Sequence, residues 1–338
     1  MSWHNLLVRL MLGALMLGVW MLGVCCPAAT LIAQSACDCY VPSYGEPGFG
    51  VSGCGGACCD GGCDWERDLG SCCTALLENL SLFAGLEGSK QPQDFGVNAN
   101  FGGRFHANLG LPLIASHGLG IQIGTALNYT DNAVQVFERV DGTKDRFQSY
   151  TTLGIFQRAD CGFSWALGYD FLAQRFYDDF NLGQVRGDIG YELSCGNEVG
   201  AWFAFGGQQD QGNYATIPVT LAPITQGNLY YRHRWENDAE TTIWLGLADG
   251  HSEPNLALGD LVPTGNRLVF GSDVFVPLSP WLSLFGQANF ITPADTGTVD
   301  AFLGIAFFPG GSHGARRRAF APRLSVANST TFANDLTR

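Results

Sequence analysis

The chain is poor in charge, and poorer still in basic residues. Charged residues make up 14% of the 338 positions, well below the roughly 25% of an average soluble domain. Lysine and arginine total 18 against 31 aspartates and glutamates, which gives a formal net charge of -13. An acidic balance of this size argues against a nucleic-acid partner, because such partners are bound through basic residues.

The sequence also lacks the motifs of the common enzyme classes. It has no nucleophile elbow, P-loop, dinucleotide fingerprint or zinc-protease motif. His251-Ser252-Glu253 places a His beside a Ser, the residue pair of outer-membrane phospholipases, but the triplet falls in an expected loop. Carboxylates such as Asp178-Asp179 suit a solvated turn better than a Ca²⁺ site. We therefore expect no enzymatic activity, no cofactor and no metal.

The sequence is instead rich in glycine and phenylalanine, and its apolar and polar residues alternate. It contains 45 Gly and 23 Phe, and in the stretch Cys161–Cys195 rings such as Phe163 and Trp165 alternate with Ser164 and Ala166. Side chains of a strand alternate between its two faces, so this stretch predicts a β-hairpin with an apolar and a polar face. Both arms are longer than a usual globular strand and close to the length of a tilted membrane-spanning strand.

Other stretches repeat this pattern and bring the number of candidate strands to twelve, an even number. The hairpin supplies two of them, and the others are Leu76–Leu86, Val97–Leu109, Leu119–Tyr129, Arg146–Gln157, Val199–Phe205, Asn228–Glu236, Thr241–Leu247, Arg267–Val276, Trp281–Phe290 and Val299–Phe308. The predicted fold class is all-β, an antiparallel, transmembrane-type up-and-down β-barrel of about 12 strands that follows a Cys-rich N-terminal segment.

The connections between these strands alternate in length. One set is short, as in Arg158–Cys161 and Pro277–Pro280, and the other is mostly longer, as in Thr130–Asp145 and Asp249–Asn266. Short turns at one end and longer loops at the other are typical of outer-membrane barrels, whereas a soluble sandwich has no reason to keep its long loops on one side. We expect the short turns to face the periplasm, together with both ends of the chain.

The chain divides into four segments. Residues 1–36 read as a signal peptide built around the apolar stretch Leu10–Val24, with a single membrane anchor or a lipoprotein signal as alternatives. Residues 37–75 are a Cys- and Gly-rich periplasmic segment, residues 76–311 the barrel, and residues 312–338 a polar, basic tail for which we expect disorder. The expected location is the outer membrane or the cell surface, with outer-membrane lipid as a partner.

Cysteine usage fits export. Eight of the 12 cysteines lie in Cys37–Cys73, where disulfides are expected and where zinc or a thiol-bearing linker are the alternatives. Contacts between copies through this cluster are a further expectation. Cys161 and Cys195 close the two ends of the hairpin and lie symmetrically about Asp178, so we predict a disulfide between them.

The candidate functional residues are the charged side chains on the polar faces of the strands. If the barrel closes, these residues line its lumen, either as a salt-bridged filling or as the wall of a weakly selective water path. They are Arg104, His106, Arg186, Asp188, Glu192, Arg232, Arg234, Glu236 and Asp273.

The whole layout resembles a group of exported, planctomycete-type outer-membrane β-barrel proteins of unknown function. The resemblance rests on the signal peptide, the Cys- and Gly-rich segment, the Phe- and Gly-rich β region and the tail Gly314–Pro322 (GARRRAFAP). It implies a location in the cell envelope and no particular activity. One departure is the stretch of about thirty residues after the last strand, where well-studied barrels end on an aromatic residue.

Together these features predict an integral outer-membrane barrel. It would act either as a passive channel for small polar solutes or as a structural component of the envelope. The alternatives are a soluble, disulfide-cross-linked surface protein and, more remotely, a lipid-modifying enzyme of the outer membrane.

Overall fold

The computed structural model describes residues 76–94, 99–132, 145–158, 162–194, 196–214, 217–249, 265–292 and 298–337. Fifteen strands lie in these residues. They are β1 (Leu80–Lys90), β2 (Asn100–Ile114), β3 (Leu119–Asn132), β4 (Asp145–Gln157), β5 (Phe163–Phe176), β6 (Asp178–Ser194), β7 (Asn197–Gln208), β8 (Asp210–Tyr214), β9 (Ile217–Pro223), β10 (Gln226–Arg234), β11 (Glu240–Ala248), β12 (Arg267–Pro277), β13 (Leu282–Ile291), β14 (Thr298–Phe307) and β15 (Asn334–Thr337). Three short 3-10 turns accompany them, η1 (Pro92–Asp94), η2 (Ala115–His117) and η3 (Ala315–Arg317).

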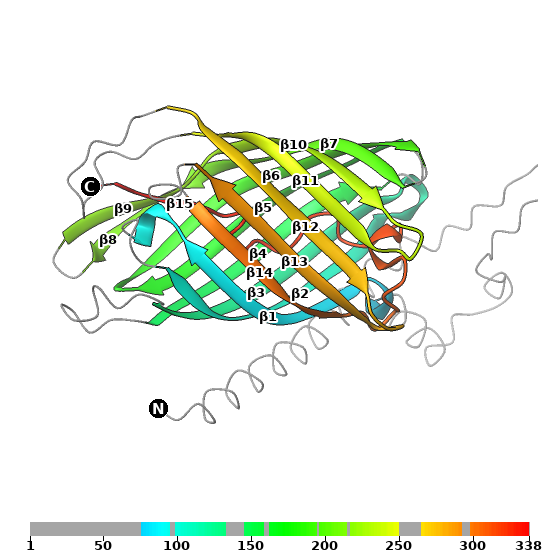
Figure 1. The fold of residues 1–338 in the computed structure, drawn as a ribbon, viewed down its shortest axis with the longest axis horizontal. Helices are drawn as coiled ribbons and strands as arrows, with labels where there is room; N and C mark the ends of the chain where they lie inside the picture. Colours follow the sequence, from blue (N-terminus) through cyan, green and yellow to red (C-terminus); the bar gives the residue numbers. More distant parts are fainter. Residues whose placement is uncertain are drawn as a thin grey trace, which may run out of the picture.

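Twelve of the described strands form one closed antiparallel barrel (Figure 1). Their order is β1-β14-β13-β12-β11-β10-β7-β6-β5-β4-β3-β2, and β15-β9-β8 form a separate three-stranded sheet. The barrel closes between β1 and β14, where Leu82 lies opposite Phe307 and Lys90 opposite Val299. Closure leaves no unpaired edge, which is the condition for a sheet to lie in lipid. The predicted fold class is confirmed.

The two ends of the barrel differ, as the sequence indicates. At one end the strands are joined by short connections such as η2, residues 235–239 and residues 278–281. At the other end lie the longer connections, among them residues 209–225, which carry β8 and β9. The tight turn between β5 and β6 is the exception at this end, where Tyr177 takes a positive φ of 62°. We call the two ends the short-turn end and the long-loop end.

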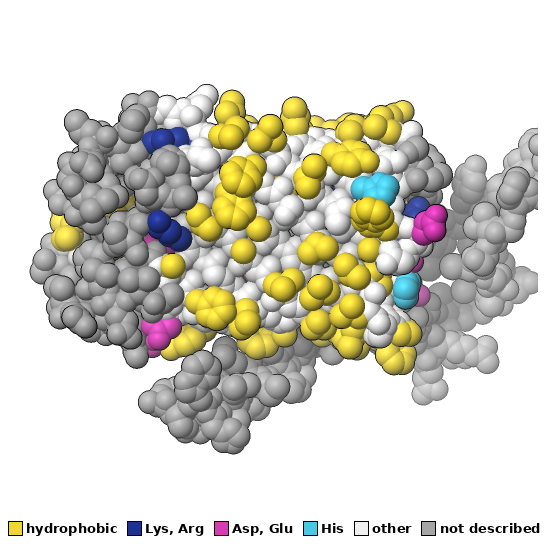
Figure 2. All heavy atoms as spheres, in the orientation of Figure 1, with side chains coloured by type: hydrophobic (Ala, Val, Ile, Leu, Met, Phe, Trp, Pro, Cys, Tyr) yellow, Lys and Arg dark blue, Asp and Glu magenta, His cyan; other side chains and the backbone are white. Residues whose placement is uncertain are grey.

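The outer surface of the barrel is apolar. Leu229 is 72% exposed, and Ile243 and Leu245 on the neighbouring β11 are 60% and 57% exposed. Figure 2 shows hydrophobic side chains across this face, with charged side chains only toward the two ends. Tyr191, Trp235 and other exposed rings lie near the short-turn end, where an aromatic girdle is expected. A soluble protein rarely exposes so wide an apolar surface.

No helix among the described residues has the length and apolar character needed to cross a membrane.

The prediction of a disordered tail is wrong. Residues 308–337, here called the C-terminal segment, leave β14 at the short-turn end, re-enter the barrel and follow its lumen to the long-loop end (Figure 1). There β15 pairs with β9, with Asn334 opposite Pro223 and Thr337 opposite Thr220. From the sequence we expect the end of the chain beside the short turns. In the structure it lies beside the long loops. The physical reason is that the inner wall supplies partners for the segment's carbonyl groups and arginines.

Candidate functional site: the occupied barrel lumen

The inward faces of the strands carry ion pairs that are shielded from solvent. Arg104 on β2 donates from Nη1 to Glu87 Oε2 on β1 at 3.2 Å and to Asn128 Oδ1 on β3 at 3.0 Å. The side chains of Arg104 and Glu87 are 0% and 1% exposed. From Nη2, Arg104 donates to the carbonyl oxygen of Ala327 in the C-terminal segment at 3.0 Å. One guanidinium thus joins three strands of the wall to the segment that fills the lumen.

Arg186 on β6 makes a similar connection. Its Nε lies 2.9 Å from Asp170 Oδ2 on the neighbouring β5, and its Nη2 donates to the carbonyl oxygen of Ser325 at 2.6 Å. The Asp170 carboxylate also accepts hydrogen bonds from Thr152 at 2.7 Å and from Gln184 at 2.9 Å. Such complete pairing is what a buried charge requires, because an unpaired one is costly in a low-dielectric interior.

A larger charged cluster lies nearer the short-turn end. Glu198 on β7 lies 3.1 Å from Arg232, 3.3 Å from Arg234 and 2.8 Å from Arg323 of the C-terminal segment. Arg234 also reaches Glu192 at 2.9 Å. Three guanidinium groups therefore converge on one carboxylate, and one of the three belongs to the segment inside the lumen.

Arg323 and Arg316 of the C-terminal segment make four further contacts in this cluster. Arg323 also pairs with Asp188 on β6 and donates to the hydroxyl of Tyr230 at 2.9 Å. Arg316 lies 3.3 Å from Glu240 on β11 and 3.5 Å from Asp273 on β12. The wall thus provides carboxylates at two separate positions along the path of the segment.

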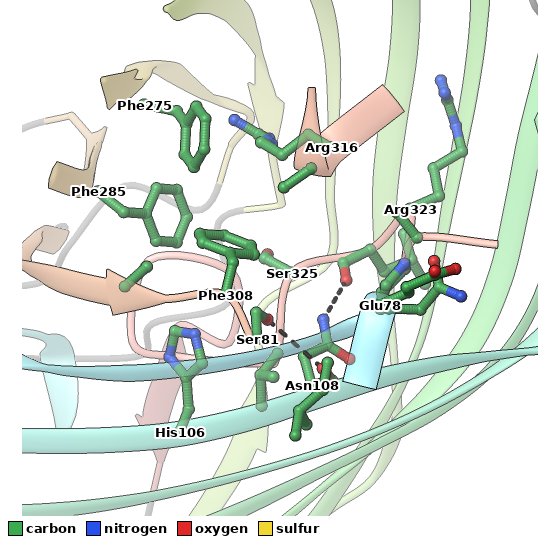
Figure 3. A pocket seen from close by; sticks show the side chains of 18 residues that line it. Glu78, Ser81, His106, Asn108, Phe275, Phe285, Phe308, Arg316, Arg323 and Ser325 are labelled. Carbon is green, nitrogen blue, oxygen red and sulfur yellow. Dashed lines mark hydrogen bonds between the residues drawn. The ribbon is translucent and has the colours of Figure 1, made fainter. Parts of the chain in front are cut away.

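His106 occupies an aromatic environment. Its ring stacks on Phe83 with centroids 4.6 Å apart and an interplanar angle of 9°, and Phe285 meets it edge-on at 6.4 Å. Figure 3 shows His106 beside a cavity of about 80 Å³ between the wall and the C-terminal segment. In the same view Asn108 reaches the segment, donating to the carbonyl oxygen of Leu324 at 3.0 Å. His106 therefore lies within the lumen.

The prediction for Glu236 is wrong. This residue is exposed in the turn after β10, because the strand ends at Arg234, two residues before the alternation in the sequence ends. Glu240, the first residue of β11, has the inward position predicted for Glu236. Its Oε1 lies 3.1 Å from Arg234 Nε, and its side chain is 5% exposed. Alternation does not define where the turn begins, and this boundary determines which of the two glutamates faces the lumen.

Sequence reasoning missed several charged partners on the inner wall. Glu87 follows the expected strand Leu76–Leu86, and Glu198 lies one residue before the expected strand Val199–Phe205. Asp170 lies in the predicted hairpin but is not among the candidate residues. An alternation that extends one or two residues past each apolar stretch would have found the first two. The contribution of Arg323 has no comparable signal, because the segment around it lacks a strand-like pattern.

A second polar group lies toward the long-loop end. Asp94 in η1 lies 3.0 Å from Arg146 and accepts hydrogen bonds from the main-chain N–H of Gln91 at 2.9 Å and from Asn100 at 2.8 Å. Burial raises the pKa of Asp94 above its usual range, although Arg146 and both hydrogen bonds oppose the shift. Tyr214 on β8 packs nearby, and burial raises the pKa of its phenol as well.

Apolar side chains fill the remaining space at this end. Phe332 and Leu336 of the C-terminal segment pack with residues of β4, β5, β6, β8 and β9, among them Tyr150, Leu172, Phe180, Tyr214 and Leu221. Tyr150 and Phe332 meet edge-on at 6.0 Å. The long-loop end is thus closed by a small hydrophobic core that the segment itself completes.

The cavities left beside the segment are small. One, of about 80 Å³, lies along β1, β2 and β12–β14, and another, of about 70 Å³, lies along β6, β7 and β10–β13. Arg316, Arg323, Leu324 and Ser325 border both. Between them the segment occupies the middle of the lumen.

Several predicted features lie outside the described residues. These are the signal peptide, the cluster Cys37–Cys73, the pair Cys161 and Cys195, and the triplet His251–Glu253. The flanking residues of the hairpin are described, and the main-chain N–H of Glu192 donates to the carbonyl oxygen of Gly162 at 3.0 Å. The disulfide stays a prediction.

The closed sheet, the apolar exterior and the paired charges inside define the class of the protein as an outer-membrane-type β-barrel with an occupied lumen. Within that class, the chain belongs to the Family of unknown function (DUF6666), whose model matches residues 79–334. The match runs from the residue before β1 to the first residue of β15, so it includes the C-terminal segment as well as the barrel. No curated protein of similar sequence was found.

Solved structures with a similar course of the chain include three outer-membrane barrels. The KdgM porin is 8% identical, with a TM-score of 0.36 over 67% of this chain and 98% of that one. The translocator domain of the autotransporter NalP from Neisseria meningitidis is 12% identical, with a TM-score of 0.40 over 72% and 93%. The outer membrane phospholipase A from Escherichia coli is 9% identical, with a TM-score of 0.36 over 67% and 95%.

Proposed function

We propose that the protein is an integral outer-membrane barrel whose lumen is closed by its own C-terminal segment, and that it serves as a structural component of the cell envelope. One observation carries the proposal: the segment from Ala321 to Leu336 is largely buried along the lumen. The aqueous channel of a porin requires an unfilled lumen. In this proposal the outer surface contacts lipid, and the protein has neither an enzymatic activity nor a cofactor.

Conductance in a planar bilayer tests the closed state. We expect the purified, full-length protein to insert without a steady ion current. A steady current from the intact protein would overturn the structural role, and charge reversal at Arg232 or Arg234 would then show by altered ion selectivity whether the current follows the lumen. Folding is checked beforehand by heat-modifiable gel mobility.

A passive channel is the second candidate, and the polarity of the inner wall favours it. Arg104, Arg186 and Glu198 would face an aqueous path if the C-terminal segment left the lumen. This candidate requires a current that appears only when the segment is released. The soluble, cross-linked alternative conflicts with the apolar exterior, and extraction by salt or reductant without detergent would support it against membrane insertion.

A further inference from the structure

The inner wall of the barrel binds the main chain of the C-terminal segment. The side chains of the wall donate to carbonyl oxygens at several positions along the segment. These contacts are Gln122 to Leu324 at 3.1 Å, Arg186 to Ser325 at 2.6 Å, Arg104 to Ala327 at 3.0 Å, Gln91 to Ser329 at 3.1 Å and Gln184 to Thr331 at 2.9 Å. Hydrogen bonds to main-chain carbonyls hold a peptide whatever its side chains, and they supply affinity.

The wall also forms ion pairs with two side chains of the segment. Arg323, which is 2% exposed, pairs with Asp188 and Glu198, and Arg316 pairs with Glu240 and Asp273. The neighbouring Arg317 is exposed. Pairing of Arg316 and Arg323 with carboxylates of the wall, while Arg317 is left outside, is the kind of selectivity that distinguishes a binding site from a general filling of space.

The shape of the wall fits a segment of small residues. A Cβ at Gly110 would come within 1.9 Å of the carbonyl oxygen of Phe320, and a Cβ at Gly124 within 2.7 Å of Val326. Both glycines lie on inward positions of β2 and β3, and they allow the segment to approach the wall directly. The residues that follow Arg323 along the narrow lumen are mostly Ser, Ala, Asn and Thr.

The segment is not part of the barrel's own hydrogen-bonded sheet. The ladder closes between β1 and β14 without it. Between Phe308 and Arg316 the connection to the barrel includes exposed Gly310 and His313 and a positive φ at Gly311 and Gly314. The segment is therefore arranged as a tethered ligand, and the tether raises its effective concentration at the site.

We propose that the lumen is a binding site for a peptide that carries an arginine followed by small residues and a turn at Asn328–Phe332, and that this peptide is supplied by the C-terminal segment of a second copy of this chain. Every copy carries the ligand, and in a shared membrane every copy presents its tether at the short-turn end. When the own segment of one copy leaves its lumen, the segment of a neighbouring copy takes its place, and such exchange links the copies. Own and foreign segments make the same contacts, so the tether favours the own segment.

The test uses the full chain, cut after it has folded. A specific protease site is inserted between His313 and Gly314, folding in detergent is confirmed by heat-modifiable mobility, and the chain is then cleaved. If that insertion prevents folding, the site is moved to Gly310–Gly311. We expect the cleaved fragment to stay bound through size-exclusion chromatography and to be replaced by a fluorescent synthetic peptide of residues 314–338.

Matched peptides define the specificity. We expect an Arg323→Gln peptide to compete at least tenfold more weakly than the native one, an Arg317→Gln peptide to compete equally well, and a scrambled peptide not to compete. The uncut chain should take up far less peptide, because its own segment is tethered. Immediate loss of the fragment, no exchange with the native peptide, or equal competition by the scrambled peptide would each overturn the proposal. These are binding measurements, so they stand or fall separately from the conductance of the barrel.

Discussion

Arg323, inside the lumen, donates from Nη2 to Glu198 of β7 at 2.8 Å and thereby ties the end of the chain to the wall of the barrel. The same carboxylate serves Arg232 and Arg234, and its side chain is 5% exposed. Its removal would leave three guanidinium groups with one acceptor fewer. This pairing is the most direct place to test whether the wall and the C-terminal segment stabilise each other.

We expect Glu198→Gln to lower the free energy of unfolding by about 3 kcal/mol, because breaking a buried ion pair leaves uncompensated charge. Urea unfolding in lipid vesicles, followed by Trp fluorescence, measures the change. Asp179→Asn is the matched control, since the Arg175–Asp179 pair is 76% and 66% exposed and should contribute nothing measurable. Equal effects of the two substitutions would contradict a buried network.

Gly110→Ala should loosen the C-terminal segment. The added Cβ would lie 1.9 Å from the carbonyl oxygen of Phe320, so the segment or the strand must shift. Overpacking of this kind costs about 1–3 kcal/mol. We expect faster trypsin cleavage in residues 316–323 and a lower temperature for the heat-modifiable transition. Gly227→Ala, where nothing lies within 4 Å of the new Cβ, should behave as the native chain, and a matching loss there would point to a general effect of strand glycines.

The end of the chain should be accessible from the side of the long loops. An epitope tag appended after Arg338 is expected to bind antibody on intact cells, because β15 pairs with β9 at that end. The same tag inserted between Asn237 and Asp238, in a short turn, should bind only after the outer membrane is permeabilised. Detection of the C-terminal tag only after permeabilisation would mean that the segment does not pass through the lumen.

A charge on the outer surface should oppose insertion into lipid. Leu245, in the middle of β11, is 57% exposed, and we expect Leu245→Arg to lower stability in a bilayer by about 2–4 kcal/mol. Folding into vesicles, scored by heat-modifiable mobility, measures this effect. Asn237→Arg, in an exposed short turn, is the control and should insert normally. Normal insertion of Leu245→Arg would argue for a soluble barrel.

The strands of the barrel are predictable from the amino-acid pattern. A period of two in polarity specifies which side chains share a face, and this was enough to place twelve strands, the alternation of short and long connections, and inward residues such as Arg104 and Arg186. Alternation does not define the strand ends, because it continues past the last paired residue. Glu236 was for this reason placed inside, and the first strand runs over Leu80–Lys90 instead of Leu76–Leu86.

The course of the C-terminal segment depends on contacts that form only in the folded barrel. Its residues have no strand-like period, and a polar, arginine-bearing stretch is by local criteria a solvated tail. It is buried because donors and carboxylates from six barrel strands, far apart in the sequence, converge on its carbonyls and on Arg316 and Arg323. That convergence exists only once the barrel has closed, so no local sequence pattern predicts it.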